Sequence, residues 1–166
     1  MRIGEMLVSA GLLKPGQVDE ILKRQRCHPE PFGLVAQRLY NLDPLDIERV
    51  WTDTTIRISR SVRPATDEID RNAIDLITRR QAWQFRFLPI RMDGTGTLIA
   101  ATTASHLSRA VRFATRILDC PCTMMLTDAE YLATNLEAYY ELPGLDARSV
   151  HEDALEPTAL TGESAA

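Results

Sequence analysis

Regular interruptions of helical periodicity constrain the first third of this chain more than any other feature. Apolar residues recur at helical spacing in four successive stretches of residues 2–54. The stretches are separated by turn-forming residues, namely Gly11, Pro15, Pro29, Pro31 and Asp43-Pro44. Glycine is typical of a helix end and proline of a first helical turn, and aspartate is a good N-cap. The pattern therefore predicts four short helices joined by tight turns.

The second half has a mixed pattern. Residues 55–68 are predicted as a linker with a short strand near Ile56 and Ile58, and Asp70 as the cap of a helix. Residues 84–92 partly alternate and precede Asp-Gly-Thr-Gly at 93–96, which indicates a hairpin with a return strand over 97–103. A helix capped by Ser105, a strand over 121–126 and a helix opened by a capping box of Thr127 and Glu130 follow. We therefore expect an α+β fold, in which a four-short-helix subdomain packs on a small α/β subdomain with a roughly three-stranded sheet.

Composition and charge set the expected domain boundaries. We expect a helical subdomain at 1–55, an α/β subdomain at 56–142 and a tail at 143–166. The last 26 residues contain one arginine and six acidic residues and little hydrophobic periodicity, which predicts an acidic, disordered tail. The net charge of −4 argues against a protein that binds nucleic-acid polymers.

The expected compartment follows from the cysteines and the apolar runs. The three cysteines are an odd number, no signal peptide is evident, and no apolar run has the length of a membrane span. We expect a reduced, cytoplasmic protein that does not insert into a membrane.

The signals for catalysis are weak. Gly94-Thr95-Gly96 has no Gly-Lys-Ser/Thr continuation and lies between strand-like runs, so a hairpin turn is favoured over a phosphate-binding loop. Cys120 and Cys122 are one residue apart, with no second Cys/His pair nearby, which favours structural thiols over a metal site. No Ser/His/Asp or Cys/His set has a recognisable spacing. We expect no enzyme, no catalytic residues, no metal and no cofactor.

Two arginine series have simple interpretations. Arg57, Arg60 and Arg63 favour a solvated linker face. Arg109, Arg112 and Arg116 lie at helical spacing opposite an apolar stripe, so they favour a solvent-facing stripe, with docking of a partner as the alternative.

The strongest functional signal is the string from Arg2 to Gln25. Gly4 allows close approach of a ligand or a helix, and the first N–H groups of the helix that begins there favour an anion. Arg2 offers a planar cationic fork, and Gln25 can both donate and accept hydrogen bonds. The candidate ligand-binding residues of this string are Arg2, Ile3, Gly4, Leu7, Val8, Gly11, Leu12, Leu13 and Gln25. The alternative is a plain helical hairpin with leucines in its core.

This string resembles the nucleotide-binding motif in the N-terminal domain of type II secretion and type IV pilus assembly ATPases, the GspE/MshE N-terminal family. The resemblance extends to residue 140 and implies a helical half followed by an α/β half. It also implies binding of cyclic di-GMP in members with two tandem copies of the motif, and docking on a membrane-platform partner. The family's ATPase domain has no counterpart in this chain, so we expect a module without ATP hydrolysis.

The resemblance places a second copy of the motif after a five-residue spacer, from Pro31. Phe32 and Gly33 stand where the motif has Leu and Gly, and we add them to the candidate ligand-binding residues. The copy departs from the motif at Pro31, Gln37, Tyr40, Asn41 and Thr54. Loss of an arginine contact costs about 1.5–3 kcal/mol. The second copy therefore keeps its fold-forming residues better than its ligand-contacting ones.

Two functions are compatible with these features. The first is a non-enzymatic, cyclic di-GMP-binding regulatory module of a secretion, pilus or exopolysaccharide system. The alternative is a protein–protein interaction or adaptor domain of a type II secretion-like machine with a degenerate ligand site.

Overall fold

A computed structural model describes residues 2–154 and confirms the mixed α+β fold. Four helices occupy the first third of the chain, as predicted: α1 (Ile3–Ser9), α2 (Pro15–Cys27), α3 (Phe32–Tyr40) and α4 (Pro44–Ile58). Pro15 and Pro44 take the first helical positions of α2 and α4, and the Asp43 carboxylate accepts from the Leu45 amide at 2.9 Å. Gly11 follows α1 with a φ of +73°, a conformation that glycine adopts without strain.

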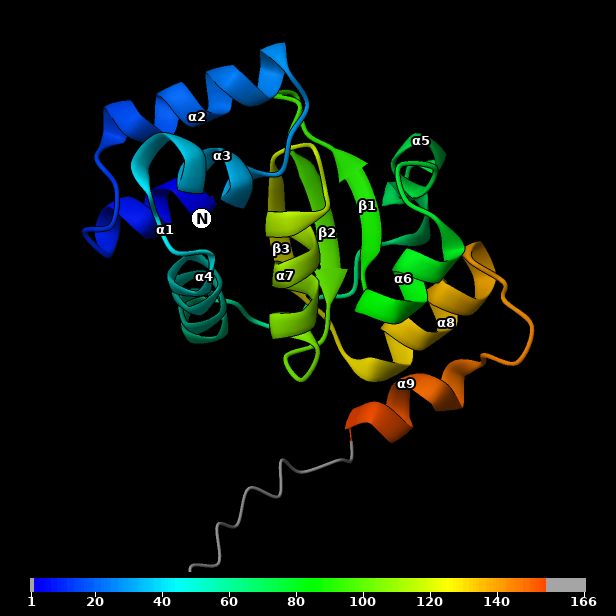
Figure 1. The fold of residues 1–166 in the computed structure, drawn as a ribbon. Helices are drawn as coiled ribbons and strands as arrows, with labels where there is room; N and C mark the ends of the chain where they lie inside the picture. The colour runs from blue at the N-terminus through cyan, green and yellow to red at the C-terminus, as the bar shows by residue number, and fades with distance from the viewer. Residues whose placement is uncertain (1, 155–166) are drawn as a thin grey trace, which may run out of the picture.

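A three-stranded mixed sheet forms the centre of the molecule (Figure 1). Its strands are β1 (Leu88–Met92), β2 (Leu98–Thr102) and β3 (Cys122–Leu126), in the order β1-β2-β3. The predicted hairpin is present, because β1 and β2 are antiparallel and joined by the turn at 93–97. β2 and β3 are parallel and are connected through helix α7 (Leu107–Arg116).

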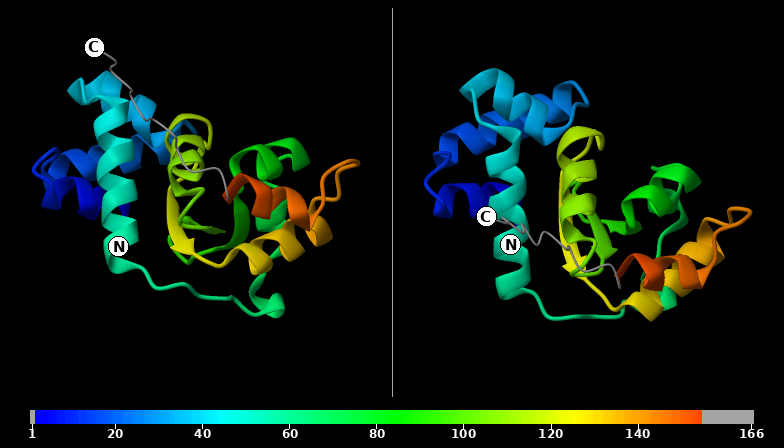
Figure 2. Two further views of the ribbon diagram at one scale, coloured as in Figure 1. Left: turned by 90° about the horizontal axis from the view of Figure 1, so that it is seen from below. Right: turned by 60° about the horizontal axis from the view of Figure 1, so that its bottom comes forward.

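Helices flank the sheet on both sides. The helical half, α1–α4, lies beside β3, whereas α5 (Arg71–Ile74), α6 (Arg79–Phe85) and α8 (Ala129–Tyr139) lie beside β1 (Figure 1). Figure 2 shows the chain after α4 crossing beneath the sheet to the 3₁₀ helix η1 (Thr66–Glu68). On the way, the Val62 amide donates to the Leu126 carbonyl at 2.8 Å. This bond ties the linker to the end of β3.

One continuous core joins the two halves. Trp51 of α4, Trp83 of α6 and Phe87 are almost completely buried, as is Phe113 of α7. The Phe113 ring lies 4.8 Å from the ring of Phe85 and 5.0 Å from that of Phe87, centroid to centroid. α7 therefore connects the aromatic core of the α/β half to the helical half, because α4 packs along it.

Several expected details are wrong. Ile56 and Ile58 belong to the last turn of α4, so no strand forms there. Residues 84–85 end helix α6, which the sequence reading missed, and the strand starts only at Leu88. The N-cap of α7 is His106, one residue after Ser105. Asp128, and not Thr127, caps α8, with its carboxylate accepting from the Tyr131 amide at 2.9 Å.

The region expected to be a disordered tail contains a further helix, α9 (Ala147–Ala154). Val150 of α9 is fully buried, and α9 packs beside α8 (Figure 1). The Arg86 Nη2 atom also donates to the Ser149 carbonyl at 2.8 Å. Disorder from residue 143 onward is therefore wrong for this helix, while residues 155–166 lie outside the described residues.

Candidate functional site

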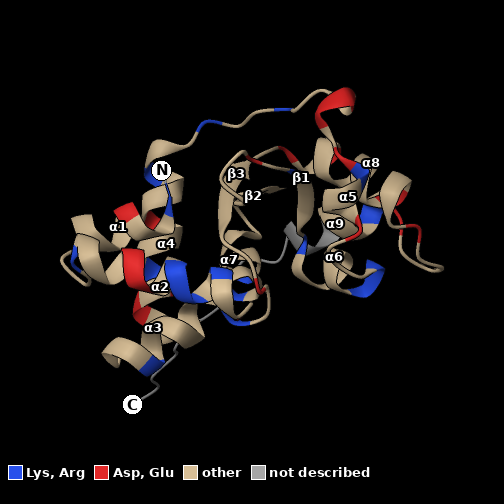
Figure 3. Cartoon of the chain, turned by 90° about the horizontal axis from the view of Figure 1, so that it is seen from above, with Lys and Arg blue, Asp and Glu red and all other residues tan. Residues whose placement is uncertain are grey.

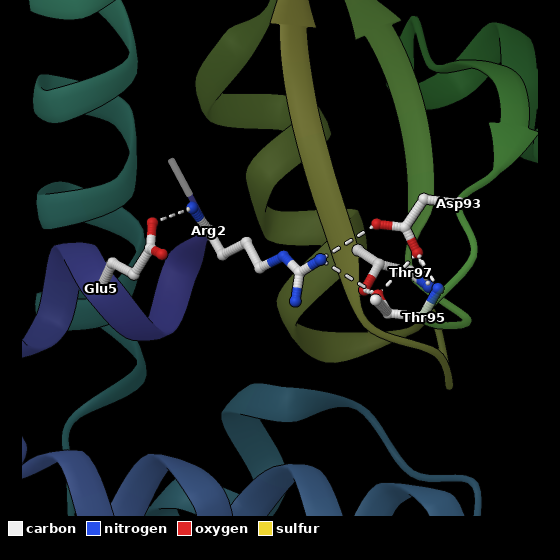
Figure 4. Close-up of polar contacts among 5 residues, drawn as sticks. All are labelled: Arg2, Glu5, Asp93, Thr95 and Thr97. Atoms are coloured by element: carbon white, nitrogen blue, oxygen red, sulfur yellow. Dashed lines mark hydrogen bonds and ion pairs between the residues drawn. The ribbon is translucent and has the colours of Figure 1, made fainter.

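Arg2 lies immediately before α1, where the predicted ligand-binding motif begins. Its Nη2 atom donates to Oδ2 of Asp93 at 3.2 Å and to Oγ1 of Thr95 at 3.1 Å (Figure 4). Both acceptors belong to the turn between β1 and β2. The Arg2 side chain is 48% exposed, and its Nε and Nη1 atoms have no hydrogen-bond partner among residues 2–154. Arg2 thus joins the two halves of the molecule and still has N–H donors for a ligand.

The β1–β2 turn is built around the Asp93 carboxylate. Its Oδ1 atom accepts from the Thr95 amide at 2.8 Å, the Thr95 hydroxyl at 2.6 Å and the Thr97 amide at 3.0 Å. The hydrogen bonds from Thr95 and Thr97, with the charge of Arg2, lower the pKa of Asp93 to about 2. Asp93 is therefore an anion at neutral pH, held by its own turn, and its second oxygen is directed at Arg2.

The first hairpin brings α1 and α2 into close contact through Gly4. A Cβ atom at this position would overlap Cγ1 of Val18 on α2, so the missing side chain serves helix packing. Gly4 could allow close approach of either a ligand or a helix, and in the structure helix α2 is the element that approaches it. Ile3, Leu7 and Leu13 are almost completely buried and belong to the core beneath this contact.

The N-terminus of α1 already has a carboxylate. The Arg2 amide donates to Oε2 of Glu5 at 2.9 Å, which is an N-terminal capping contact (Figure 4). A negative side chain at this end favours the helix and opposes an anionic ligand at the same N–H groups. The expected anion site at the first N–H groups of this helix is therefore not supported, and the Arg2 side chain is the cationic feature that remains.

A groove runs between α2 and the β1–β2 turn, next to Arg2. A cavity of about 350 Å³ and a neighbouring one of about 200 Å³ share five lining residues: Arg2, Asp19, Leu22, Thr97 and Pro121. Ile3 and Gly4 line the smaller cavity, while Arg26 and Thr95 line the larger one. Ligand pockets commonly measure about 300–1,000 Å³, and the larger cavity alone reaches that range. The groove therefore gathers the start of the predicted motif with residues of the α/β half.

The remaining residues of the first motif are dispersed. Val8 is partly exposed and lines a further hollow of about 350 Å³, which shares Gly4 and Val18 with the smaller cavity of the groove. Gly11 is exposed and Leu12 is partly buried. Gln25 is only 3% exposed, and its Nε2 atom donates to the Glu30 carbonyl at 2.8 Å. Gln25 thus fastens the turn between α2 and α3. The structure gathers Arg2, Ile3 and Gly4 at the groove but not Gly11, Leu12, Leu13 or Gln25.

The second motif copy faces α7. Phe32 is 3% exposed, and a Cβ at Gly33 would lie 2.7 Å from the Thr115 carbonyl oxygen of α7. Pro31, which stands where the motif has arginine, is the N-cap of α3. The start of the second hairpin is therefore occupied by another part of the same chain.

The arginine stripe on α7 is engaged within the molecule. Arg116 Nε lies 2.5 Å from Oε1 of Glu48 on α4, and Arg112 Nε lies 3.6 Å from its Oε2. Arg109 donates to the Gln84 carbonyl at 3.4 Å. In Figure 3, basic and acidic segments are interspersed over α2, α4 and α7. Arg112 and Arg116 join α7 to α4, and Arg109 joins α7 to α6, so these arginines do not form a free docking stripe.

No metal or redox centre is evident in the part of the chain that the structure describes. Residues 2–151, whose side chains the structure describes, contain no group of three His, Cys, Asp or Glu side chains able to hold a metal ion. Burial raises the pKa of Cys120 to about 11 and that of Cys122 well above its ordinary value, so both thiols are protonated at neutral pH. A hollow of about 760 Å³ between α5, α6 and α8 contains none of the predicted site residues. Within these same residues, no helix has the length and apolar character needed to cross a membrane.

The sequence pattern did not single out Thr95 and Arg26, which line the groove, or Asp93, which pairs with Arg2 beside it. Asp93 and Thr95 were interpreted only as turn residues, and Arg26 only as part of a spacer. The Asp-Gly-Thr-Gly pattern predicts the turn but not its contact with Arg2, because the partners are 91 residues apart. Their role emerges only from the tertiary fold.

Comparison with known proteins identifies a family. Residues 56–144, more than half of the chain, match the MshEN domain. The matched segment is the α/β half, so the Arg2–Gln25 motif lies outside it. A solved structure described as "Structure of MshE with cdg" is 19% identical, covers 84% of this chain and 99% of its own, and has a TM-score of 0.42. No curated protein matches the chain.

Proposed function

Because this chain belongs to the MshEN domain family, we propose that it is a non-enzymatic regulatory module that binds cyclic di-GMP through its first helical hairpin. The bound state would be relayed to a secretion, pilus or exopolysaccharide system in the cytoplasm. The observation that carries the proposal is the position of Arg2, half exposed beside a groove whose wall includes Ile3 and Gly4 of the motif.

The chemistry of this groove suits a phosphodiester of guanine. The guanidinium of Arg2 can donate to a phosphate or to O6 and N7 of a guanine. Leu22 and Pro121 supply apolar surface in the same groove for stacking of a base. Thr95, Gly96 and Thr97 of the β1–β2 turn line the opposite wall. The buried candidates of the first motif, Leu7, Leu13 and Gln25, would support this hairpin from within the core.

Isothermal titration calorimetry with cyclic di-GMP tests the proposal, using the whole chain and Arg2→Ala. We expect saturable binding by the wild type and an affinity about ten- to a hundredfold lower for the variant, the range for a charged hydrogen bond. Arg49→Ala is the matched control, because Arg49 also forms an exposed ion pair, with Asp46 at 2.5 Å on α4. No heat with the wild type, or equal affinity in Arg2→Ala, would overturn the proposal and favour the alternative, an adaptor domain with a degenerate ligand site.

A further inference from the structure

Arg26, in the last turn of α2, lines the same groove as Arg2. The groove's larger cavity has α2 on one side, with Asp19, Leu22 and Arg26, and the β1–β2 turn on the other, with Thr95, Gly96 and Thr97. The lining of the larger cavity includes Arg2, Arg26 and Asp19, and Glu5 lines the smaller cavity. Arg2 already forms an ion pair with Asp93, so Arg26 is the arginine of the groove that has no ion-pair partner among the described residues. An arginine of this kind can bind an anionic group of a ligand.

The donors of Arg26 are largely unused. Its Nε atom donates to the Leu22 carbonyl at 3.3 Å, one helical turn back. Among residues 2–154, neither Nη atom of Arg26 has a hydrogen-bond or ion-pair partner. In Arg2, by contrast, Nη2 already donates to both Asp93 and Thr95. The Nη1–Nη2 edge of Arg26 can therefore bind a phosphate bidentately without breaking an existing contact, whereas Nη2 of Arg2 is already engaged.

The second motif copy cannot supply this cation. Pro31 stands where the motif has arginine, and the adjoining Gly33 packs on the Thr115 carbonyl of α7. A cyclic dinucleotide has two phosphates, and a site with only Arg2 would leave one of them without a cationic partner.

We infer that Arg26, in the spacer between the two motif copies, is a ligand-binding residue that holds one phosphate of a cyclic dinucleotide, while Arg2 holds the other half. The inference rests on the proposed function and moves the ligand away from the second hairpin. The dinucleotide would then lie between α2 and the β1–β2 turn, and so contact both halves of the molecule.

A simpler role for Arg26 is that of a cation near the negative end of the α2 dipole. Arg24 shares that role, because it lies in the same last turn and is exposed. Arg24 does not line either cavity of the groove. Arg24→Ala is therefore a matched control, which removes the same charge from the same turn.

Calorimetric titration with cyclic di-GMP separates the possibilities, with wild type, Arg26→Ala, Arg26→Lys and Arg24→Ala compared at low and high salt. We expect at least about tenfold weaker binding in Arg26→Ala and no change in Arg24→Ala. Arg26→Lys should lose an intermediate amount of affinity, because lysine keeps the charge but not the planar guanidinium. The salt dependence of the affinity should decrease in Arg26→Ala, because one charged contact is lost. Unchanged thermal unfolding would show that each variant folds.

The outcomes distinguish this inference from the proposed function. If the wild type binds and Arg26→Ala weakens binding no more than Arg24→Ala does, the inference is overturned and the proposed function stays intact. An absence of binding by the wild type would overturn both. A comparison with the linear dinucleotide pGpG tests the ligand class, and a preference for the linear form would overturn the assignment to a cyclic dinucleotide.

Discussion

The two helical hairpins, α1–α2 and α3–α4, start alike but serve different purposes. Each has a buried apolar residue followed by a glycine at the start of its first helix, Ile3-Gly4 and Phe32-Gly33. Gly4 lets α1 approach α2 within its own hairpin, whereas Gly33 lets α3 approach α7 of the α/β half. The residue before this apolar–glycine pair is Arg2 in the first hairpin and Pro31 in the second.

This difference shows how a repeated motif can divide its functions. The first hairpin closes on itself and leaves Arg2 at a groove. The second hairpin is docked through Gly33 and through Glu48, whose carboxylate contacts Arg112 and Arg116 of α7. A position committed to packing on α7 cannot also receive a ligand. The hairpin with proline in place of arginine is thus the one that packs on α7, while Arg2 of the first hairpin contacts the β1–β2 turn.

The largest effect is expected at the docked glycine. Gly33→Ala places a Cβ against a backbone carbonyl that cannot rotate away, so we expect about 2 kcal/mol of destabilisation in chemical denaturation. Gly16→Ala is the matched control, because Gly16 is also at the second position of its helix and has open space around it. That control should be neutral or slightly stabilising. Equal stability of the two variants would mean that α3 does not dock on α7.

The second largest loss of stability is expected when the ion pairs between α4 and α7 are removed. Glu48→Gln removes the charge of a carboxylate that is only 8% exposed and contacts two arginines, so we expect a loss of about 1–2 kcal/mol in the free energy of unfolding. Asp46→Asn, in an exposed ion pair two residues earlier on α4, should cost less than about 1 kcal/mol. A larger loss in Asp46→Asn than in Glu48→Gln would contradict the assignment of Glu48 to the docking contact.

The first hairpin should tolerate its glycine change better than the second. Gly4→Ala meets a side-chain methyl group of Val18, which can shift, and we expect a loss of about 1 kcal/mol. The double variant Gly4→Ala/Val18→Ala removes the overlapping atom, so a double-mutant cycle should give a favourable coupling energy. Strictly additive effects would show that the two residues do not pack as described.

The smallest effect is expected in the way the free energy of unfolding depends on pH under acidic conditions. The folded-state pKa of Asp93, about 2, is below the ordinary value of 3.8, so its contribution is present above pH 4 and is lost as the pH falls towards 2. Asp93→Asn should therefore lower stability by about 1 kcal/mol at pH 7, after allowance for partial solvent screening. The difference from the wild type should vanish near pH 2. A difference that persists at pH 2 would point to a disrupted turn instead of a lost charge.

The sequence predicted the elements better than their contacts. Proline, glycine and the Asp43 cap are local signals, and they correctly mark the four helices of the first half. Residues 84–85 were interpreted as strand because aromatic residues favour strands. Helix α6 opens with a capping box of Thr78 and Gln81, a local signal that was overlooked, and ends at Arg86 with a φ of +50°. The Trp83 Nε1 atom also donates to the Tyr140 carbonyl at 2.7 Å, a tertiary contact without a local signature.

The same limit applies to the candidate site. The motif spacing identified Arg2, Ile3 and Gly4, which the fold brings to the groove. It could not show that Gln25 donates to the Glu30 carbonyl, that Gly33 packs against α7, or that Arg26 lines the groove. Those facts depend on which faces the helices present to one another, and residue spacing does not specify this.

The central claim is that the first hairpin, and not the second, receives the ligand. Backbone amide chemical shifts of the isotope-labelled chain, recorded during titration with cyclic di-GMP, test it most directly. We predict that the largest shift changes fall at Arg2–Glu5, at Leu22–Arg26 and at Thr95–Thr97, with little change at Phe32–Val35. Shift changes centred on Phe32–Val35 and on Thr115 of α7, or none at all, would contradict the account.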